Sequence, residues 1–425
     1  MLFTTLGLAP QLQQALDACG YSDMTPVQEQ AIVPARRGKD LLVSAQTGTG
    51  KTAAFAIPLL QQLLDNPRAD ESTAPRGLIL CPTRELAEQL AATIRSYAQF
   101  TQLTITAVFG GMKMSAQASK LKRGVDILIA TPGRLTEHMA EGNVNLKACE
   151  FVVLDEADRM LDMGFIDSVQ QLLQHTAKNK QTLLFSATVS AAVNELAHKI
   201  LHNYQVVRVD KQNSTAVTVA HVVYPVEERR KIDLFMELLA EYNWYQVLVF
   251  TSTKEQADRL LASLQQKGVN AEVCHGDRSQ GARRRAIANF KAGDTQVLIA
   301  TEVAARGLDI QGLEYVINFN LPYLAEDYVH RIGRTGRAGS QGYAISFVSR
   351  EEERALEGIQ RLIGSKIQRI KQPGYDVSNR DSLLKTVARS PRLSRSNKSS
   401  QPQNAGVHKS KKPAAAGKSG VKKKR

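Results

Sequence analysis

Short apolar runs alternate with segments of mixed polarity along most of this chain. Leu41–Val43 and Phe151–Leu154 are apolar throughout, which is typical of strands buried inside a sheet. The segment that begins with Ala53–Ala56, shortly after the first run, is predicted to be helical. This alternation of buried strands and helices predicts an α/β fold with parallel sheets.

Two pairs of segments repeat at one shared offset. Leu78–Leu90 is similar to Leu248–Leu260, and Ile127–Thr131 is similar to Val297–Thr301. Both pairs lie 170 residues apart, and each repeated unit contains an apolar strand. A common offset for two separate motifs indicates two similar α/β domains in tandem.

The first apolar run leads into a glycine-rich segment. Its residues are Ala45, Gln46, Thr47, Gly48, Thr49, Gly50, Lys51 and Thr52. Glycines let the backbone wrap around phosphates, whose charge the N–H groups at a helix N-terminus stabilise. Lys51 can then reach the β- and γ-phosphates, and the Thr52 hydroxyl can hold Mg²⁺. The usual pattern has glycine at the first position, where this chain has Ala45.

An acidic segment follows the second apolar run. Asp155, Glu156, Ala157 and Asp158 come directly after Leu154. A carboxylate at such a strand end suits Mg²⁺, and a neighbouring carboxylate can orient an attacking water. A glycine-rich loop alone can be an ordinary turn, and an acidic pair alone is more often a solvated surface. Both together, each after a strand and in this order, predict ATP hydrolysis.

The second half has no phosphate loop, so we expect one ATP, bound by the first domain and facing the second. A candidate contribution of the second domain is His330–Arg337, in which three arginines are spaced by three; on a helical path they would fall within about 120° of arc. A basic surface patch is the simpler interpretation. Gly333 and Gly336 between the arginines favour close approach to a ligand. Arginine fingers on a γ-phosphate would raise the rate by roughly 10³–10⁵-fold.

The positive charge is concentrated at the C-terminus. The net charge is +14, and Arg369–Arg425 holds 16 of the 55 basic residues but 2 of the 41 acidic ones, which leaves the remainder neutral. This segment has one aromatic residue, Tyr375, and is predicted to be disordered. A solubilising tail is possible, but we favour a tether to nucleic-acid phosphates, which would ignore sequence and depend on salt.

Other features limit the class of protein. No apolar stretch reaches 18 residues and the N-terminus lacks a signal-peptide pattern, so neither a membrane helix nor a signal peptide is expected. The four cysteines form no Cys-x-x-Cys pair. We therefore expect a reduced, cytoplasmic protein without a zinc site.

Together these motifs resemble the DEAD-box ATP-dependent RNA helicases, most closely the bacterial RhlE-like subgroup, over roughly residues 1–370. The resemblance implies two tandem RecA-like domains at 1–209 and 219–370 with a linker at 210–218. The composition, not the resemblance, predicts a disordered basic RNA-binding tail at 371–425. Gln28 would read adenine and Tyr21 would stack on it, with Phe3 as a buttress or as the alternative stacking residue. Asp155 would hold Mg²⁺ through water, and Glu156 would be the water-orienting base.

The resemblance also implies roles in the second half and in coupling. Gly307 and Asp309 would contact the nucleotide, and Arg334 and Arg337 would be the arginine fingers. Ser186, Thr188, Asp158 and His330 would couple hydrolysis to RNA. Glu302 stands where the family usually has Asp, and we expect activity to survive this change.

The implied RNA contacts are small, hydroxylated or basic residues. They are Thr83, Arg84, Gly110, Gly111, Thr131, Pro132, Gly133 and Arg134 in the first half, and Thr253, Gln280, Arg283 and Thr301 in the second. Such residues suit backbone phosphates and 2′-hydroxyls, so base readout should be weak.

The resemblance thus predicts an RNA helicase with ATP and Mg²⁺ as cofactors, acting on short duplexes in ribosome assembly or RNA turnover. Ribosomal precursors or RNA-decay proteins would be its partners. Two other classes remain open. A passive RNA chaperone would anneal without ATP, and a DNA translocase would be stimulated by DNA.

Overall fold

The computed structural model describes residues 1–45, 48–68, 72–209, 219–305, 310, 312–336 and 342–375. The described residues belong to one compact unit, Met1–Val377. Several residues with predicted roles lie outside the described part: Gln46, Thr47, Gly307, Asp309 and Arg337. The proposed linker at 210–218 and nearly all of the tail also lie outside it.

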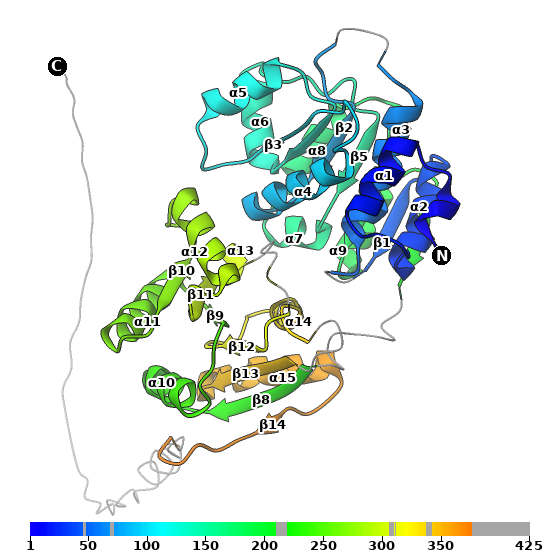
Figure 1. The fold of residues 1–425 in the computed structure, drawn as a ribbon. Helices are drawn as coiled ribbons and strands as arrows, with labels where there is room; N and C mark the ends of the chain where they lie inside the picture. The colour runs from blue at the N-terminus through cyan, green and yellow to red at the C-terminus, as the bar shows by residue number, and fades with distance from the viewer. Residues whose placement is uncertain are drawn as a thin grey trace, which may run out of the picture. The chain divides into compact units, whose positions relative to one another are not determined.

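The described strands form two parallel sheets of seven strands each (Figure 1). The first sheet consists of β1 (Leu41–Ser44), β2 (Gly77–Leu80), β3 (Ile105–Val108), β4 (Ile127–Ala130), β5 (Phe151–Leu154), β6 (Gln181–Ser186) and β7 (Gln205–Arg208). The second consists of β8 (Val219–Pro225), β9 (Val247–Thr251), β10 (Ala271–Cys274), β11 (Val297–Thr301), β12 (Tyr315–Asn318), β13 (Gly342–Val348) and β14 (Gln368–Arg369).

The two sheets have the same strand order. It is β3-β4-β2-β5-β6-β1-β7 in the first sheet and β10-β11-β9-β12-β13-β8-β14 in the second. The segments that repeat at an offset of 170 residues fall on equivalent strands, β2 with β9 and β4 with β11. The predicted tandem of two α/β domains is therefore confirmed.

Helices connect the strands in both halves. In the first half they are the 3₁₀ helix η1 (Phe3–Leu6), α1 (Pro10–Ala18), α2 (Pro26–Arg36), α3 (Lys51–Asp65), α4 (Arg84–Tyr97), α5 (Met114–Lys122), α6 (Pro132–Ala140), α7 (Ala157–Asp162), α8 (Ile166–Gln174) and α9 (Ala191–Ile200). In the second half they are η3 (Glu228–Arg230), α10 (Lys231–Glu241), α11 (Lys254–Gln266), α12 (Gln280–Ala292), α13 (Glu302–Ala305), α14 (Ala325–Ile332), η4 (Arg350–Glu352) and α15 (Glu353–Ile363).

Strand residues alternate between two apolar cores because successive side chains of a strand point to opposite faces. In β5, Phe151 and Val153 pack with α1 to α4, whereas Val152 and Leu154 pack with α5 to α9. Both faces of the sheet are covered, which explains why these strands are apolar throughout.

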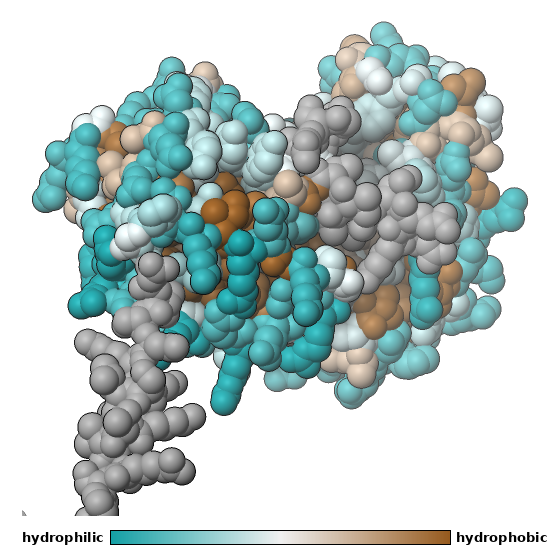
Figure 2. Space-filling view, turned by 90° about the horizontal axis from the view of Figure 1, so that it is seen from below, coloured by the Kyte–Doolittle hydropathy of each residue, from teal (hydrophilic) through white to brown (hydrophobic). Residues whose placement is uncertain are grey.

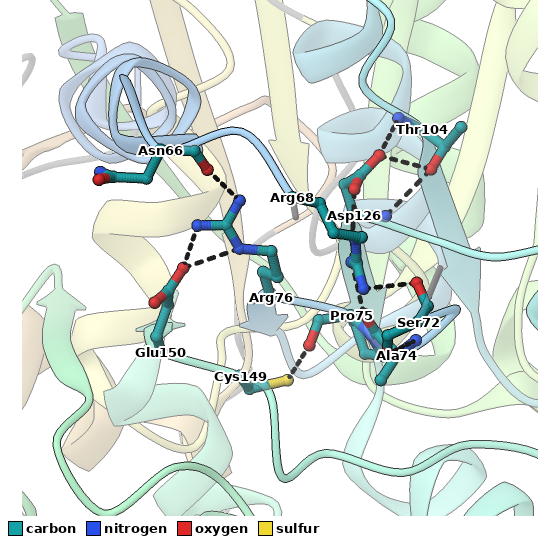
Figure 3. A network of polar contacts seen from close by, with 10 residues as sticks. All are labelled: Asn66, Arg68, Ser72, Ala74, Pro75, Arg76, Thr104, Asp126, Cys149 and Glu150. Atoms are coloured by element: carbon teal, nitrogen blue, oxygen red, sulfur yellow. Dashed lines mark hydrogen bonds and ion pairs between the residues drawn. The ribbon is translucent and has the colours of Figure 1, made fainter. Parts of the chain in front are cut away.

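Polar contacts close one end of the first sheet, where β2, β4 and β5 begin (Figure 3). The Arg76 guanidinium donates to Glu150 at 2.8 Å, and Asp126 accepts hydrogen bonds from the Thr104 backbone N–H and hydroxyl at 2.8 Å each. Arg68 donates to the Ala74 carbonyl at 2.7 Å. These bonds hold the connection between α3 and β2 against the N-terminal ends of the strands. The candidate site lies at the opposite, C-terminal ends.

The ordered chain continues past the predicted end of the second domain. The Gln372 amide and the Tyr375 hydroxyl both donate to Glu237 of α10, each at 2.8 Å. The Arg230 guanidinium lies 4.3 Å from the centre of the Tyr375 ring. Gln372 and Tyr375, which the sequence prediction places in the tail, are thus bound to α10.

Hydrophilic side chains cover most of the face in Figure 2, with apolar side chains visible between them. The longest helix in the described part of the chain, α3, has 15 residues, too few to cross a bilayer.

Candidate active site and nucleic-acid groove

A cavity of about 260 Å³ lies at the ends of the first-sheet strands that carry the predicted ATP site. It is lined by Tyr21, Gly48, Gly50, Lys51, Thr52, Ala53, Leu86, Gln89, Thr93, Tyr97, Asp155, Glu156 and Arg334. The cavity therefore unites the glycine-rich segment, the acidic pair and the predicted adenine-stacking Tyr21 with an arginine of the second half.

The glycine-rich segment has the geometry of a phosphate cradle. Gly50 precedes α3 with φ +94°, and a Cβ there would lie 2.4 Å from the Gln28 amide nitrogen, so a larger residue is excluded. The Lys51 side chain is 7% exposed, and its ammonium has no hydrogen-bond partner among the described residues. A buried, unpaired ammonium beside a helix N-terminus suits a bound phosphate.

Gln28 connects the start of α2 to this cradle. Its side-chain oxygen accepts from the Thr25 backbone N–H at 2.8 Å, and its amide nitrogen donates to the Gly50 carbonyl at 3.2 Å. The side chain is 1% exposed. The predicted base-reading residue thus touches the phosphate-binding segment itself.

Aromatic residues hold Tyr21 at the cavity wall. The fully buried Phe3 meets the Tyr21 ring edge-to-face, with centroids 5.7 Å apart. On its other side Tyr21 meets Tyr97 edge-to-face at 5.6 Å, and the two hydroxyls lie 2.8 Å apart. Of the two aromatic candidates, Tyr21 lines the cavity and Phe3 lies behind it.

The two acidic residues differ in environment. Burial raises the pKa of Asp155 to about 6, and the Glu156 charge adds to this while nearby Lys51 opposes it. Asp155 and Thr52 both line the cavity, and a carboxylate with a hydroxyl is a donor set that suits Mg²⁺. Glu156 has φ +54°, a strained conformation for a residue with a side chain, and strain of this kind is common at functional sites.

The Asp158 carboxylate is hydrogen-bonded to the segment Ser186–Thr188 at the end of β6. It accepts from the Ala187 N–H at 3.1 Å and from the Thr188 N–H and hydroxyl at 3.0 Å each. The Ser186 hydroxyl donates to the Thr188 carbonyl at 2.6 Å. The acidic segment and the end of β6 are therefore one hydrogen-bonded unit.

Arg331 and Arg334 do not lie on one helix, because α14 ends at Ile332 and Gly333 follows as its C-cap. Arg334 is 7% exposed and lines the cavity. Arg331 is buried elsewhere: it forms an ion pair with Glu302 at 2.5 Å and donates to the Asn320 carbonyl at 2.7 Å.

Arg159 is a residue that the sequence reasoning missed. It follows the acidic segment and forms a buried ion pair with Asp327 of α14. His330 lies 3.9 Å from the same carboxylate. Arg159 also pairs with Asp162 within α7 at 3.0 Å, but no local pattern indicates its pair with Asp327, which lies in the other half of the chain.

A larger cavity of about 650 Å³ forms a groove between the strand ends of both halves. Nine of the predicted RNA contacts line it: Thr83, Arg84, Gly110, Thr131, Gly133, Arg134, Thr253, Arg283 and Thr301. Gly111, Pro132 and Gln280 are not among the lining residues. Met163, Phe165 and Val303 add an apolar part of the wall that the motifs did not indicate.

Equivalent threonines cap equivalent helices along this groove. The Thr83 hydroxyl accepts from the Leu86 N–H at the start of α4, and the Thr253 hydroxyl accepts from the Gln256 N–H at the start of α11. The repeat found in the sequence therefore places an equivalent capping threonine from each half along the groove.

Gly110, which lines the groove, and its neighbour Gly111 make room for Arg84. A Cβ on Gly111, whose φ is +80°, would lie 2.2 Å from a guanidinium nitrogen of Arg84, and one on Gly110 would lie 3.2 Å from another. Arg134 donates to the Met112 carbonyl at 2.9 Å. The glycines thus position an arginine, in addition to any phosphate that they admit.

Two predicted RNA contacts of the second half pair with α4. Arg283 and Glu85 form a buried ion pair at 2.6 Å, and the Gln280 amide donates to Glu85 at 3.3 Å. Nearby, Arg284 donates to Glu88 at 3.0 Å on the surface. Arg283 is therefore held by a carboxylate in this structure.

Comparison with known proteins agrees with this geometry. The model of the DEAD/DEAH box helicase family matches residues 25–196, and the model of the helicase conserved C-terminal domain matches residues 230–339. The chain is 38% identical over 387 residues to the DEAD-box ATP-dependent RNA helicase CshA of Bacillus subtilis, which covers 91% of this chain and 77% of the relative.

Two further relatives extend the comparison. The ATP-dependent RNA helicase RhlB of Pseudomonas syringae is 41% identical over 370 residues, covering 86% of this chain and 93% of RhlB. The structure of Dbp5 from S. cerevisiae bound to RNA and ADP BeF3 is similar with a TM-score of 0.77 and 31% identity, covering 91% of this chain and 98% of Dbp5.

Proposed function

This chain belongs to the DEAD-box ATP-dependent RNA helicases, and on that premise we propose that it separates short RNA duplexes or remodels RNA–protein complexes by RNA-stimulated ATP hydrolysis. The observation that carries the proposal is the cavity that unites Lys51, Glu156 and Arg334. Arg334 comes from the second half of the chain. Catalysis in this cavity therefore needs both halves, which a passive RNA chaperone would not.

The residues of the cavity divide the reaction among them. Lys51 and the backbone around Gly50 hold the phosphates, while Gln28 and Tyr21 hold the base. Glu156 orients the water that attacks the γ-phosphate and yields ADP and phosphate. Arg334, and Arg337 as the sequence predicts, stabilise the negative charge of the transition state. Thr52 and Asp155 would hold Mg²⁺, which would supply further neutralisation of the phosphate charge when bound.

Coupling to RNA follows from the contacts of the acidic segment. Asp158 is bonded to Thr188, and Arg159 is paired with Asp327, so a shift at Glu156 reaches both β6 and α14. We propose that ATP and RNA together favour the arrangement in which the two halves meet. Closure would bend one strand and release its complement, and hydrolysis would then loosen the grip.

RNA would lie in the larger groove with its backbone toward the protein. The groove offers hydroxyls, glycines and arginines, which suit phosphates and 2′-hydroxyls, and it offers Phe165 as a single aromatic side chain among its lining residues. We therefore propose weak base readout. The DNA translocase interpretation is less favoured because DNA lacks the 2′-hydroxyls that these groove residues suit.

The remaining assignments are proposals that rest on sequence. They comprise the division into 1–209, 210–218 and 219–370, the RhlE-like subgroup, the basic tail as an RNA tether and a cytoplasmic location. Ribosome assembly and RNA turnover remain the two proposed processes, with ribosomal precursors or RNA-decay proteins as partners. The related proteins named CshA and RhlB support the helicase activity and do not choose between these processes.

Steady-state ATP hydrolysis with single-stranded RNA, with single-stranded DNA and without nucleic acid tests the proposed function. We expect strong stimulation by RNA and little by DNA. Equal stimulation by DNA would favour the translocase. Strand annealing without ATP, together with no hydrolysis, would favour the chaperone.

A further inference from the structure

One helix touches both cavities. α4 contributes Leu86, Gln89, Thr93 and Tyr97 to the wall of the nucleotide cavity. These positions follow a helical spacing of three or four residues, so they form one stripe along the helix. At its first turn the same helix presents Arg84 and Glu85 to the groove, next to its cap Thr83.

The far end of α4 meets the predicted adenine-stacking residue. Tyr97 is the last residue of the helix and is 2% exposed, and its hydroxyl lies 2.8 Å from that of the half-buried Tyr21. Phe3 packs against Tyr21 from the other side. Tyr21 therefore cannot tilt toward or away from a base without disturbing its contact with Tyr97.

The near end of α4 holds the groove residues in place. The Thr83 hydroxyl accepts from the Leu86 N–H, Arg84 lies over the glycine pair, and Glu85 pairs with Arg283. The 14-residue helix spans about 21 Å, and its buried face packs in the first core, so it moves as one body.

We infer that Tyr97 is a positioning residue that couples the adenine end of the nucleotide cavity to the RNA groove through α4. The inference rests on the proposed function. Stacking of a base on Tyr21 fixes the position of Tyr97 and, through it, the position of α4. The position of α4 in turn places Thr83, Arg84 and Glu85 for contact with RNA. Coupling of this kind is reciprocal, so RNA in the groove tightens ATP binding by the same factor.

The test is a thermodynamic cycle on the full chain. The affinity for the non-hydrolysable ATP analogue AMP-PNP is measured with and without saturating single-stranded RNA, and RNA affinity with and without AMP-PNP. The coupling ratio is the factor by which saturating RNA tightens AMP-PNP binding. We expect Tyr97→Phe, which keeps the ring and removes the hydroxyl, to lower this ratio about three- to tenfold, the size expected for one neutral hydrogen bond.

Two more variants define the contact. Tyr21→Phe removes the other hydroxyl of this hydrogen-bonded pair. The double variant should lower the coupling ratio no further than either single variant does. Tyr224→Phe is the matched control, because it breaks a tyrosine pair with Tyr242 in the second half. It should leave the ratio unchanged.

The outcomes separate the possible failures. A Tyr97→Phe ratio within twofold of the unsubstituted chain, or equal weakening of all four affinities, would overturn the inference and leave a packing role only. If Tyr97→Phe does not fold, Tyr21→Phe decides by the same criterion. If the unsubstituted chain shows neither coupling nor RNA-stimulated hydrolysis, the proposed function fails together with the inference.

Discussion

Arg159 of α7 and Asp327 of α14 form an ion pair in which the side chains are 4% and 8% exposed. The two residues come from different halves of the chain, and the pair lies beside the acidic segment of the nucleotide site. Arg159 also pairs with Asp162 at 3.0 Å, but that contact lies within α7, so of the two ion pairs only the one with Asp327 joins the two halves. This contact therefore stabilises only the arrangement in which the halves meet.

We expect Asp327→Asn to reduce RNA-stimulated ATP turnover at least tenfold. The substitution removes one of the two carboxylates that pair with the buried Arg159 guanidinium and leaves Asp162, 3.0 Å away, as the other, so it weakens the arrangement with both halves together. Steady-state hydrolysis at saturating RNA measures the effect.

Glu88→Gln is the matched control for Asp327→Asn. It removes a charge from the pair with Arg284, whose side chains are 25% and 51% exposed, and such pairs contribute at most about 1 kcal/mol. Its turnover should stay within about threefold of the unsubstituted chain. Equal losses in the two variants would contradict the importance of the buried pair.

Replacement of Glu156 should separate stability from activity. Glu156→Gln keeps the strained backbone and loses the water-orienting carboxylate, so hydrolysis should fall at least a hundredfold while ATP still binds. Glu156→Gly should be equally inactive but more stable by about 0.5–1 kcal/mol, because φ +54° suits glycine. Thermal melting and single-turnover hydrolysis check the two halves of this prediction. RNA-stimulated turnover near the normal rate in Glu156→Gln would refute the assigned role.

Gly111→Ala should weaken RNA binding about tenfold without changing ATP affinity in the absence of RNA. The new methyl group would displace the Arg84 guanidinium, 2.2 Å away, from its place at the groove. The matched control is Gly142→Ala. Its φ of +68° imposes similar backbone strain, but nothing lies within 4 Å of its Cβ. Titration of labelled RNA should show the loss for Gly111→Ala only, and equal losses would mean that strain alone is responsible.

Deletion of residues 378–425 should weaken RNA binding and flatten its dependence on salt. This segment carries most of the net positive charge, and each lysine or arginine near a phosphate releases counterions on binding. RNA affinity measured over a range of KCl concentrations gives the slope, and AMP-PNP affinity serves as the control. An unchanged slope would rule out the tether.

The sequence revealed the local parts of the site because each is contiguous. The phosphate cradle, the acidic segment and the strands before them lie within short stretches, and the 170-residue offset placed equivalent strands correctly. Most predicted RNA contacts also line one groove. These features depend on local backbone geometry and on the order of the strands.

The contacts that the sequence did not reveal connect distant segments. Arg159 pairs with a residue 168 positions away, and Tyr97 meets Tyr21 across 76 positions. No periodicity marks such pairs, because they depend on how helices pack. The spacing of the arginines likewise did not reveal their different places: Arg331 is buried within α14, whereas Arg334 follows the C-cap Gly333 and lines the nucleotide cavity.

The matching strand orders of the two halves have a consequence for what the groove can hold. Thr83 and Thr253 each cap the first turn of equivalent helices, α4 and α11, and both line the groove. A binding site that repeats one contact is complementary to a ligand that repeats one chemical group. A polymer with a repeating backbone meets that condition whatever its side groups are, so the duplicated architecture itself favours a chain of identical phosphodiester links over any particular order of bases.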